Sequence, residues 1–443
     1  MKKHLFLILA VILAGCRDNA YNRIIDYINT LEIVDSHEHL QTPGDPADFY
    51  FFNTVSYFTS DIYSAGSPSF YDPEKKKFKV DSLWNKFGEY YNYSRATSYH
   101  EQLMNTLRIL YGYNKPYLVK DDINNLYNRM LVNRYNNYDK WFDEVYKKSR
   151  FKTMLLDQYW NHFNTQIDTT HFTLVCNISS CVLLVNEAAQ TKKITSDKNF
   201  LKLMNREVLN TESLTDYINL VDSVINIFRR NGAVCLKNVL AYSRSIYFED
   251  IDYSTADRIY NKSGILSEQE KKQLQDFMFH HIIRQSIKLG MPIQVHTGYL
   301  AGNSGWLDNG NPMKLLNLFI EYPRARFILF HGGYPWTGDF IALGKQFSNV
   351  YLDLVWLPQI SKTAAIRAFH EMLDAVPYNK IMWGGDVLVI DDAVGSLELG
   401  KEVVATVLSE RVEKGWMTEE LAHDIARHVF RDNAIELFHL KND

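Results

Sequence analysis

The sequence lacks a long basic stretch, a cysteine-rich metal pattern and a glycine-rich loop after its first apolar strand. The formal net charge is only −4, and without a basic cluster we expect no nucleic-acid partner. The four cysteines form no Cys-x-x-Cys pair, which excludes the usual cysteine zinc motif. The missing glycine-rich loop argues against a dinucleotide-binding sheet.

What is present is enough apolar material for a large core. Hydrophobic residues make up 46% of the chain and aromatic residues 14%. A length of 443 residues is long for one ordinary domain, but it suits a barrel that carries insertions.

The first sixteen residues, MKKHLFLILAVILAGC, have the pattern of an export signal. Two lysines precede an apolar run that is too short to span a membrane as an ordinary helix. The ending Leu13-Ala14-Gly15-Cys16 resembles the bacterial lipobox, which implies removal of residues 1–15 and a lipid on Cys16. An ordinary signal peptide or a buried helix is the alternative. Arg17 favours the outer membrane slightly, so we expect a lipid-anchored, extracytoplasmic protein of the cell envelope.

Eight apolar runs of strand length follow one another, and most precede a stretch with helical spacing. Alternating strands and helices predict a parallel sheet covered by helices. Eight such units predict an α/β fold, the (β/α)8 TIM barrel, with an open doubly wound sheet as the alternative. Residues 43–148, rich in Tyr and Asn, are predicted to be a mostly helical insertion after strand 1. The predicted strands are 31–37, 150–157, 172–179, 233–240, 292–297, 326–331, 349–355 and 380–385.

The segment LEIVDSHEHLQTP places two histidines at the end of the first predicted strand. Residues i and i+2 of a strand point to the same face, so His37 and His39 should project together. Two neutral imidazoles on one face make half of a metal site.

Other polar residues stand at the ends of later predicted strands. They are Lys237, then His296 in QVHTG, His331 in LFHGG and Asp386 in WGGD. The chemistry of a TIM barrel lies at the carboxyl ends of its strands, so these side chains should meet there. Imidazole and carboxylate ligands suit a catalytic divalent metal that keeps one position open for water.

The order of these residues resembles the amidohydrolase superfamily. The segment PIQVHTGYLAGN, the segment RARFILFHGGYPWTGDF and the ending RDNAIELF are similar to its amidohydrolase-2 branch. The resemblance is strongest over residues 230–441, with the first strand added. It implies that residues 16–443 form a metal-dependent barrel enzyme. The ligands it implies are His37, His39, His296 and Asp386, with His331 close by.

The resemblance also implies roles. Asp386 would move the proton of water, and His331 would polarise a carbonyl group or complete the coordination. Lys237 occupies the position of a metal-bridging carboxylated lysine in some members; we expect it here as a substrate or outer-shell group. One ion is therefore favoured over two, with zinc first and manganese second. Candidate substrate contacts, all following strands, are Arg244, Tyr299 and Trp306.

Three functions follow as hypotheses. The first is a hydrolase in which metal-activated water attacks an amide, ester or lactone carbonyl of a small molecule. The second is a metal-dependent decarboxylase or a uronate-isomerase-like enzyme, since VDSHEHL also resembles the first strand of uronate isomerases. The third is a non-catalytic lipoprotein that binds a ligand. The oligomeric state is not predicted.

Overall fold

The computed structural model describes residues 19–40, 57–67, 80–133 and 137–441. The predicted signal segment 1–15, the lipidation site Cys16 and parts of the predicted insertion 43–148 lie outside these residues. No helix in the described ranges is both long and apolar enough to cross a membrane.

Eight parallel strands form one sheet, in which each strand pairs with the next strand of the same sheet along the chain. Each overlaps one of the eight predicted strands, so the predicted barrel is confirmed. Only the two-stranded antiparallel ladder of β4 (Lys193–Ile194) and β5 (Leu209–Asn210) was not foreseen. The barrel strands are β1 (Ile33–Glu38), β2 (Phe151–Leu156), β3 (Phe172–Asn177), β6 (Cys235–Asn238), β7 (Ile293–Val295), β8 (Phe327–Leu329), β9 (Val350–Asp353) and β10 (Ile381–Met382).

The sheet closes through backbone hydrogen bonds between the first strand and the segment after the last one. Ser36 N–H donates to the Trp383 carbonyl (3.3 Å), and Asp386 N–H donates to the His37 carbonyl (2.9 Å). His39 N–H donates to the Val387 carbonyl (3.0 Å). Closure therefore brings residues 36–39 and 383–387 together, at the edge where chemistry is expected.

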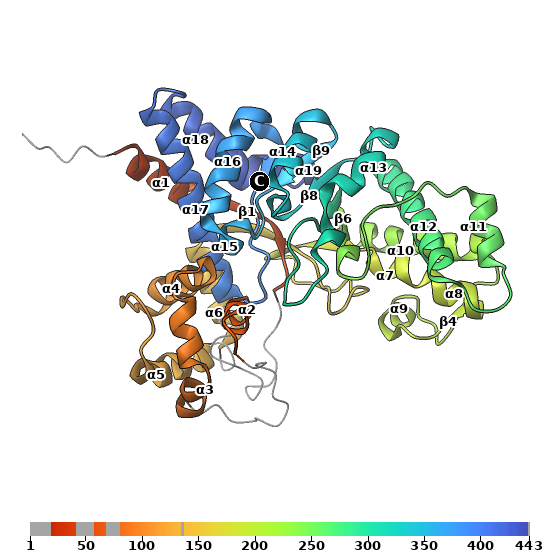
Figure 1. The fold of residues 1–443 in the computed structure, drawn as a ribbon, viewed down its shortest axis with the longest axis horizontal. Helices are drawn as coiled ribbons and strands as arrows, with labels where there is room; N and C mark the ends of the chain where they lie inside the picture. The colour runs from red at the N-terminus through yellow and green to blue at the C-terminus, as the bar shows by residue number, and fades with distance from the viewer. Residues whose placement is uncertain (1–18, 41–56, 68–79, 134–136, 442–443) are drawn as a thin grey trace, which may run out of the picture.

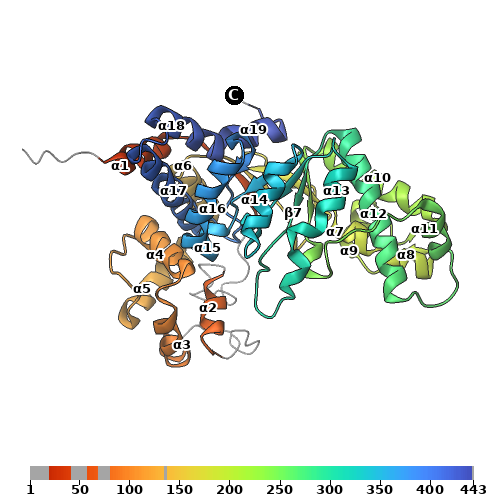
Figure 2. The ribbon, with the colours of Figure 1, turned by 45° about the horizontal axis from the view of Figure 1, so that its top comes forward.

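Helices surround the sheet, as Figures 1 and 2 show. Local signals mark both ends of α12, which starts at a capping box formed by Ser267 and Glu270 and stops at Gly290, whose φ is 66°. The covering helices include α1 (Ala20–Thr30), α10 (Leu214–Arg230), α12 (Glu268–Leu289), α14 (Thr337–Gln346), α16 (Lys362–Ala375), α17 (Ile390–Glu413) and α18 (Glu419–Arg427).

The described part of the insertion after β1 is helical. Helices α3, α4 and α5 lie together in orange at the lower left of Figure 1, beside the end of α17. The close approach of α4 and α17 depends on Gly395, because a Cβ there would overlap the Thr106 hydroxyl and the backbone carbonyl of Gln102. The insertion helices are α2 (Phe58–Ser64), α3 (Val80–Ser94), α4 (Ser98–Tyr111), α5 (Lys120–Leu131) and α6 (Tyr138–Lys148).

The lower interior of the barrel is filled by apolar side chains and by the C-terminal helix α19 (Asn433–Phe438). Asn433 fixes this helix by donating to the carbonyls of Tyr378 and Ile381. The buried inner cluster consists of Val34, Leu155, Val175, Cys235, Ile328, Phe330, Val355 and Met382, with Ala434, Ile435, Leu437 and Phe438 from the helix. The NAIELF segment is thus a plug for the barrel floor.

Acidification is expected to destabilise the insertion through His100. This buried side chain of α4 bonds the Tyr91 hydroxyl through Nε2 (2.9 Å). Burial, and then the charge of Arg95, lower its pKa to about 4. Between pH 6.5 and 4, His100 is protonated in the unfolded chain but not in the folded chain. The free energy of unfolding therefore falls as the pH drops through this window.

We expect the effect of His100 to lower the free energy of unfolding by roughly 2 kcal/mol between pH 6.5 and 5. Urea unfolding at both pH values checks this, with His100→Gln as the comparison. The variant should lose less stability on acidification than the unaltered chain does. Equal losses would show that His100 is not the titrating group.

Candidate metal centre and active-site pocket

Three predicted ligands converge at the closure of the barrel. In the described residues, His37, His39 and Asp386 have ligand atoms that all lie within 4.8 Å of one another. His37 lies at the carboxyl end of β1, His39 directly follows that strand, and Asp386 follows β10. The i, i+2 spacing therefore brings the two imidazoles together, as the sequence predicts.

The distances within this triangle suit a metal ion. His37 Nε2 lies 3.3 Å from His39 Nε2, and Asp386 Oδ1 lies 3.1 Å from His39 Nε2 and 3.7 Å from His37 Nε2. Ligands held about 2.1 Å from zinc in tetrahedral geometry are roughly 3.4 Å apart. Two imidazole nitrogens and a carboxylate oxygen at this spacing fit a divalent cation.

Backbone contacts fix the orientation of two of these ligands. His39 Nδ1 is 2.7 Å from the Asp157 carbonyl, which leaves Nε2 facing the triangle. Asp386 sits at a φ of 58°, a left-handed conformation that costs energy for a residue with a side chain. The Tyr57 hydroxyl donates to the Asp386 carbonyl (2.8 Å) and helps to hold this turn.

A buried pair of acids braces the same turn from below. Gly385 N–H donates to Asp35 Oδ1 (3.0 Å), and Val387 N–H donates to Glu38 Oε2 (2.7 Å). Burial raises the pKa of Asp35 to about 7, and burial and Asp35 together raise the pKa of Glu38. Such a pair, sharing a proton, accepts backbone hydrogen bonds without bringing two negative charges together.

The same surroundings keep Asp386 ionised. Burial acts to raise its pKa, but the hydrogen bond from His39 and the neighbouring imidazoles lower it well below the usual value. Burial lowers the pKa of His37 strongly and that of His331 to about 4, so both rings are neutral near pH 7. For His39 burial is outweighed by the hydrogen bond to Asp386, which raises its pKa. Neutral imidazoles and an ionised carboxylate are the forms that bind a metal.

His296 and His331 stand next to the triangle but face each other. His331 Nε2 is 3.1 Å from His296 Nδ1, and His331 Nδ1 is 3.1 Å from the Val355 carbonyl. The other nitrogen of His296 is 2.9 Å from the Tyr299 carbonyl. His331 also approaches Asp386, at 3.8 Å between Nδ1 and Oδ2. His296 as a fourth ligand therefore stays a prediction.

Lys237 lies beneath the triangle, fully buried at the end of β6. Its Nζ is 2.9 Å from His37 Nε2 and 3.8 Å from the centre of the Phe330 ring. Burial lowers the pKa of this amine to about 8, against the opposing charge of Asp157. A lysine in this state is partly neutral near pH 8, which suits an amine placed beside a metal.

A pocket of about 380 Å³ opens over the centre. His39, His296 and Asp386 form its floor, and aromatic rings stand beside the imidazoles: Tyr159 is 5.0 Å from His39 and Tyr242 is 4.7 Å from His296, between ring centres. Its described wall residues are Tyr57, Tyr159, His162, Ser179, Ser180, Leu183, Val239, Leu240, Tyr242, Ser243, Ala301 and Leu388.

The three predicted substrate contacts are not in this described wall. Arg244 pairs with Asp276 at 2.6 Å and bonds Gln275, so its guanidinium holds α12. Trp306 is 74% exposed, and Tyr299 contacts the site through its carbonyl oxygen. Their roles as substrate contacts stay predictions.

Sequence reasoning missed a buried polar layer below the metal triangle. Asn177 Nδ2 donates to both oxygens of Asp157 (3.0 and 3.2 Å), and Ser36 donates to Asp353 (2.6 Å). Gln294 donates to the Ser36 carbonyl (2.8 Å). A usable signal existed: Asp157, Asn177, Gln294 and Asp353 are polar residues inside or just after otherwise apolar strands.

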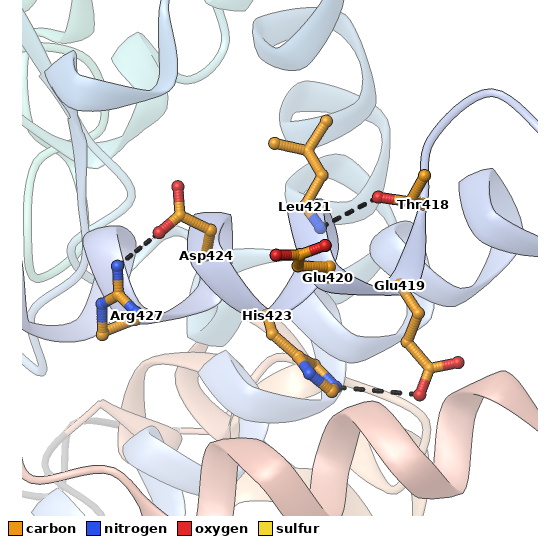
Figure 3. A pocket seen from close by; sticks show the side chains of 7 residues that line it. All are labelled: Thr418, Glu419, Glu420, Leu421, His423, Asp424 and Arg427. Atoms are coloured by element: carbon orange, nitrogen blue, oxygen red, sulfur yellow. Dashed lines mark hydrogen bonds and ion pairs between the residues drawn. The ribbon is translucent and has the colours of Figure 1, made fainter.

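A second depression, of about 620 Å³, lies on α18 and is drawn in Figure 3. Its side chains pair with one another: Arg427 with Asp424, and His423 with Glu419 at 3.9 Å. It carries no member of the metal triangle, and we assign no chemistry to it.

The triangle predicts an order of importance among the histidines. We expect His37→Ala to lower zinc affinity by at least about tenfold more than His296→Ala does. The reason is that both ring nitrogens of His296 already contact protein groups, His331 and the Tyr299 carbonyl. Competition with a zinc chelator measures both affinities. Equal losses would make His296 a full ligand.

Part of the chain is similar to a known protein family. Residues 266–440 match the family model for amidohydrolases. The protein fluG of Emericella nidulans is 26% identical over 228 residues, which cover 47% of this chain and 26% of fluG. The chain thus spans about a quarter of the length of that relative.

Solved structures are similar over nearly the whole chain. A uronate isomerase from Thermotoga maritima is 14% identical, with a TM-score of 0.73, over 98% of this chain and 100% of its own. A protein from Lactobacillus casei named as a metal-dependent hydrolase is 14% identical, with a TM-score of 0.64, over 94% and 97%. At this identity the likeness concerns the fold. With the family match over residues 266–440, this part of the chain is similar to amidohydrolases; the class of reaction is a separate question.

Proposed function

We propose that this chain is a hydrolase that uses one divalent cation to cleave an amide, ester or lactone of a small molecule. The observation that carries the proposal is the triangle of His37 Nε2, His39 Nε2 and Asp386 Oδ1, with sides of 3.1 to 3.7 Å. When bound, the cation would supply a Lewis acid and lower the pKa of water. We propose zinc first and manganese second, because imidazole and carboxylate ligands suit both.

The chain's own residues supply the rest. Asp386, held ionised, can accept a proton at its second oxygen while Oδ1 faces the histidines. His331 has its Nδ1 held by the Val355 carbonyl and its Nε2 beside His296, so its neutral ring keeps a fixed orientation and holds His296 at the floor of the pocket. Lys237 lies close enough to His37 to hold the lower side of the site or to bind a polar substrate group.

The test begins with the metal content of the purified mature protein, by elemental mass spectrometry before any chelator step. About one equivalent is expected, followed by turnover of members of an amide, ester and lactone panel. His37→Ala should lose both. About two equivalents would make Lys237 a carboxylated bridge. No metal after reconstitution would favour a non-catalytic binding protein and overturn the proposal.

Isomerisation of a sugar acid is the second candidate. The whole-chain similarity to a uronate isomerase supports it, since that match includes the region of the helical insertion. Turnover of D-glucuronate by the metal-loaded protein, with no hydrolysis of the panel, would replace the first proposal by the second. Release of carbon dioxide from aromatic or unsaturated acids would instead identify a decarboxylase.

We also propose that the mature chain is anchored in the cell envelope by a lipid on Cys16. The support is the sequence MKKHLFLILAVILAGC alone. Cys16→Ser is expected to move the protein from the membrane fraction to the soluble fraction of an expressing bacterium. An unchanged membrane fraction would contradict lipid anchoring at this residue.

A further inference from the structure

The pocket wall indicates what kind of substrate the enzyme takes. Among the described wall residues, five are aliphatic, three are tyrosines, three are serines and one is a histidine, and none is a lysine or an arginine. The aliphatic residues are Leu183, Val239, Leu240, Ala301 and Leu388. Such a surface favours an apolar group, because burying it against these side chains removes apolar area from water.

Several polar groups of the wall are already occupied by the protein. The Ser179 hydroxyl accepts from Val239 N–H (2.9 Å), and the Tyr242 hydroxyl accepts from Ala301 N–H (3.0 Å). The Tyr57 hydroxyl donates to the Asp386 carbonyl (2.8 Å). These groups stiffen the mouth of the barrel and have less capacity left for a polyhydroxylated or anionic ligand.

The charge arrangement acts in the same direction. The one carboxylate among the described residues that line the pocket is Asp386, on the floor, where it is a proposed metal ligand. The one nearby amine, Lys237, is buried below the floor and is not part of the described wall. A substrate carboxylate placed among the aliphatic residues would lose its water without gaining a charged partner there, which is costly.

We propose that the organic part of the substrate is an uncharged aryl or alkyl group, seated against Leu183 and its aliphatic neighbours. The reactive carbonyl then lies over His39 and Asp386, between the rings of Tyr159 and Tyr242. A volume of about 380 Å³ suits a compact molecule with one aromatic ring. This substrate class rests on the proposed metal centre and argues against a uronic acid.

The test compares two metal-binding probes that differ by one charge. Benzohydroxamic acid and 4-carboxybenzohydroxamic acid are titrated into the zinc-loaded protein by calorimetry. We expect the neutral probe to bind at least about tenfold more tightly, a difference of about 1.4 kcal/mol. Equal or tighter binding of the carboxylated probe, or no binding of either by protein that holds zinc, overturns the proposal.

A charge placed in the wall should invert the preference. Leu183→Arg is expected to favour the carboxylated probe over the neutral one. Leu184→Arg is the matched control, since Leu184 is the next residue, is equally half-buried and is not in the described wall. The control should keep the original preference. Inversion by both variants would mean that position 183 has no special role, which contradicts the assignment.

Failure of the metal centre has a different signature. A protein that takes up no zinc refutes the proposed hydrolase, whatever the wall prefers. The wall is then tested without metal, by the binding of benzamide against 4-carboxybenzamide. Tighter binding of benzamide supports the apolar assignment, and the reverse order overturns it.

Discussion

Asp386→Asn is expected to lower kcat/KM by about a thousandfold and to reduce the bound metal well below one equivalent. The carboxylate forms two sides of the ligand triangle and is the group that can accept the proton of water. A loss of roughly 4 kcal/mol of transition-state stabilisation corresponds to that factor. Steady-state kinetics and elemental analysis of the same preparation measure both effects.

The control for this variant is Asp339→Asn, on the exposed side of α14. It makes the same chemical change at a position outside the pocket and should leave metal content and kcat/KM unaltered. Circular dichroism should show a folded barrel for both proteins. Full turnover by Asp386→Asn would remove this residue from the mechanism.

Gly385→Ala is expected to destabilise the protein by about 1–3 kcal/mol and to lower metal occupancy. A Cβ on this residue would overlap Glu38 Oε1 and lie 3.1 Å from Asp35 Oδ2. Both acids hold the backbone on either side of Asp386, so relief of the overlap must move the turn that presents this ligand. Urea unfolding and metal analysis measure the two effects.

Gly338→Ala is the matched control. This glycine lies near the start of α14, and a Cβ there would meet no atom within 4 Å. Because alanine favours helix more than glycine does, the control should be neutral or slightly stabilising. If Gly385→Ala were equally harmless, the acid pair would not be what positions Asp386.

The barrel was predictable because its signals are local. Each strand is a short apolar run, and α10 and α12 end at Asn231-Gly232 and Gly290, where the sequence places stops. Because His37, His39 and Asp386 stand at the ends of predicted strands, they could be placed together at one rim of the barrel. The order of the strands and the right-handed connections between parallel strands leave few other ways to bring those residues together.

The parts that were not predicted depend on contacts between distant segments. Arg244 follows a strand as a substrate residue would, but Asp276, on another helix, takes its guanidinium. Similarly, the short β4–β5 ladder depends on pairing across a loop rather than on a strong apolar run. The acid pair of Asp35 and Glu38 gives no pattern in the sequence, because its purpose is set by a turn some 350 positions further along the chain.

The closure of the barrel has a consequence for the life of the newly made chain. Two ligands of the proposed metal lie near residue 40 and the third at residue 386, so the ribosome must add about 350 residues before the set is complete. At 5–20 residues per second this takes roughly 20 to 70 seconds. During that interval β1 has no partner on its β10 side. The three proposed ligands can therefore bind a metal together only after synthesis has passed Asp386, when the chain is nearly complete.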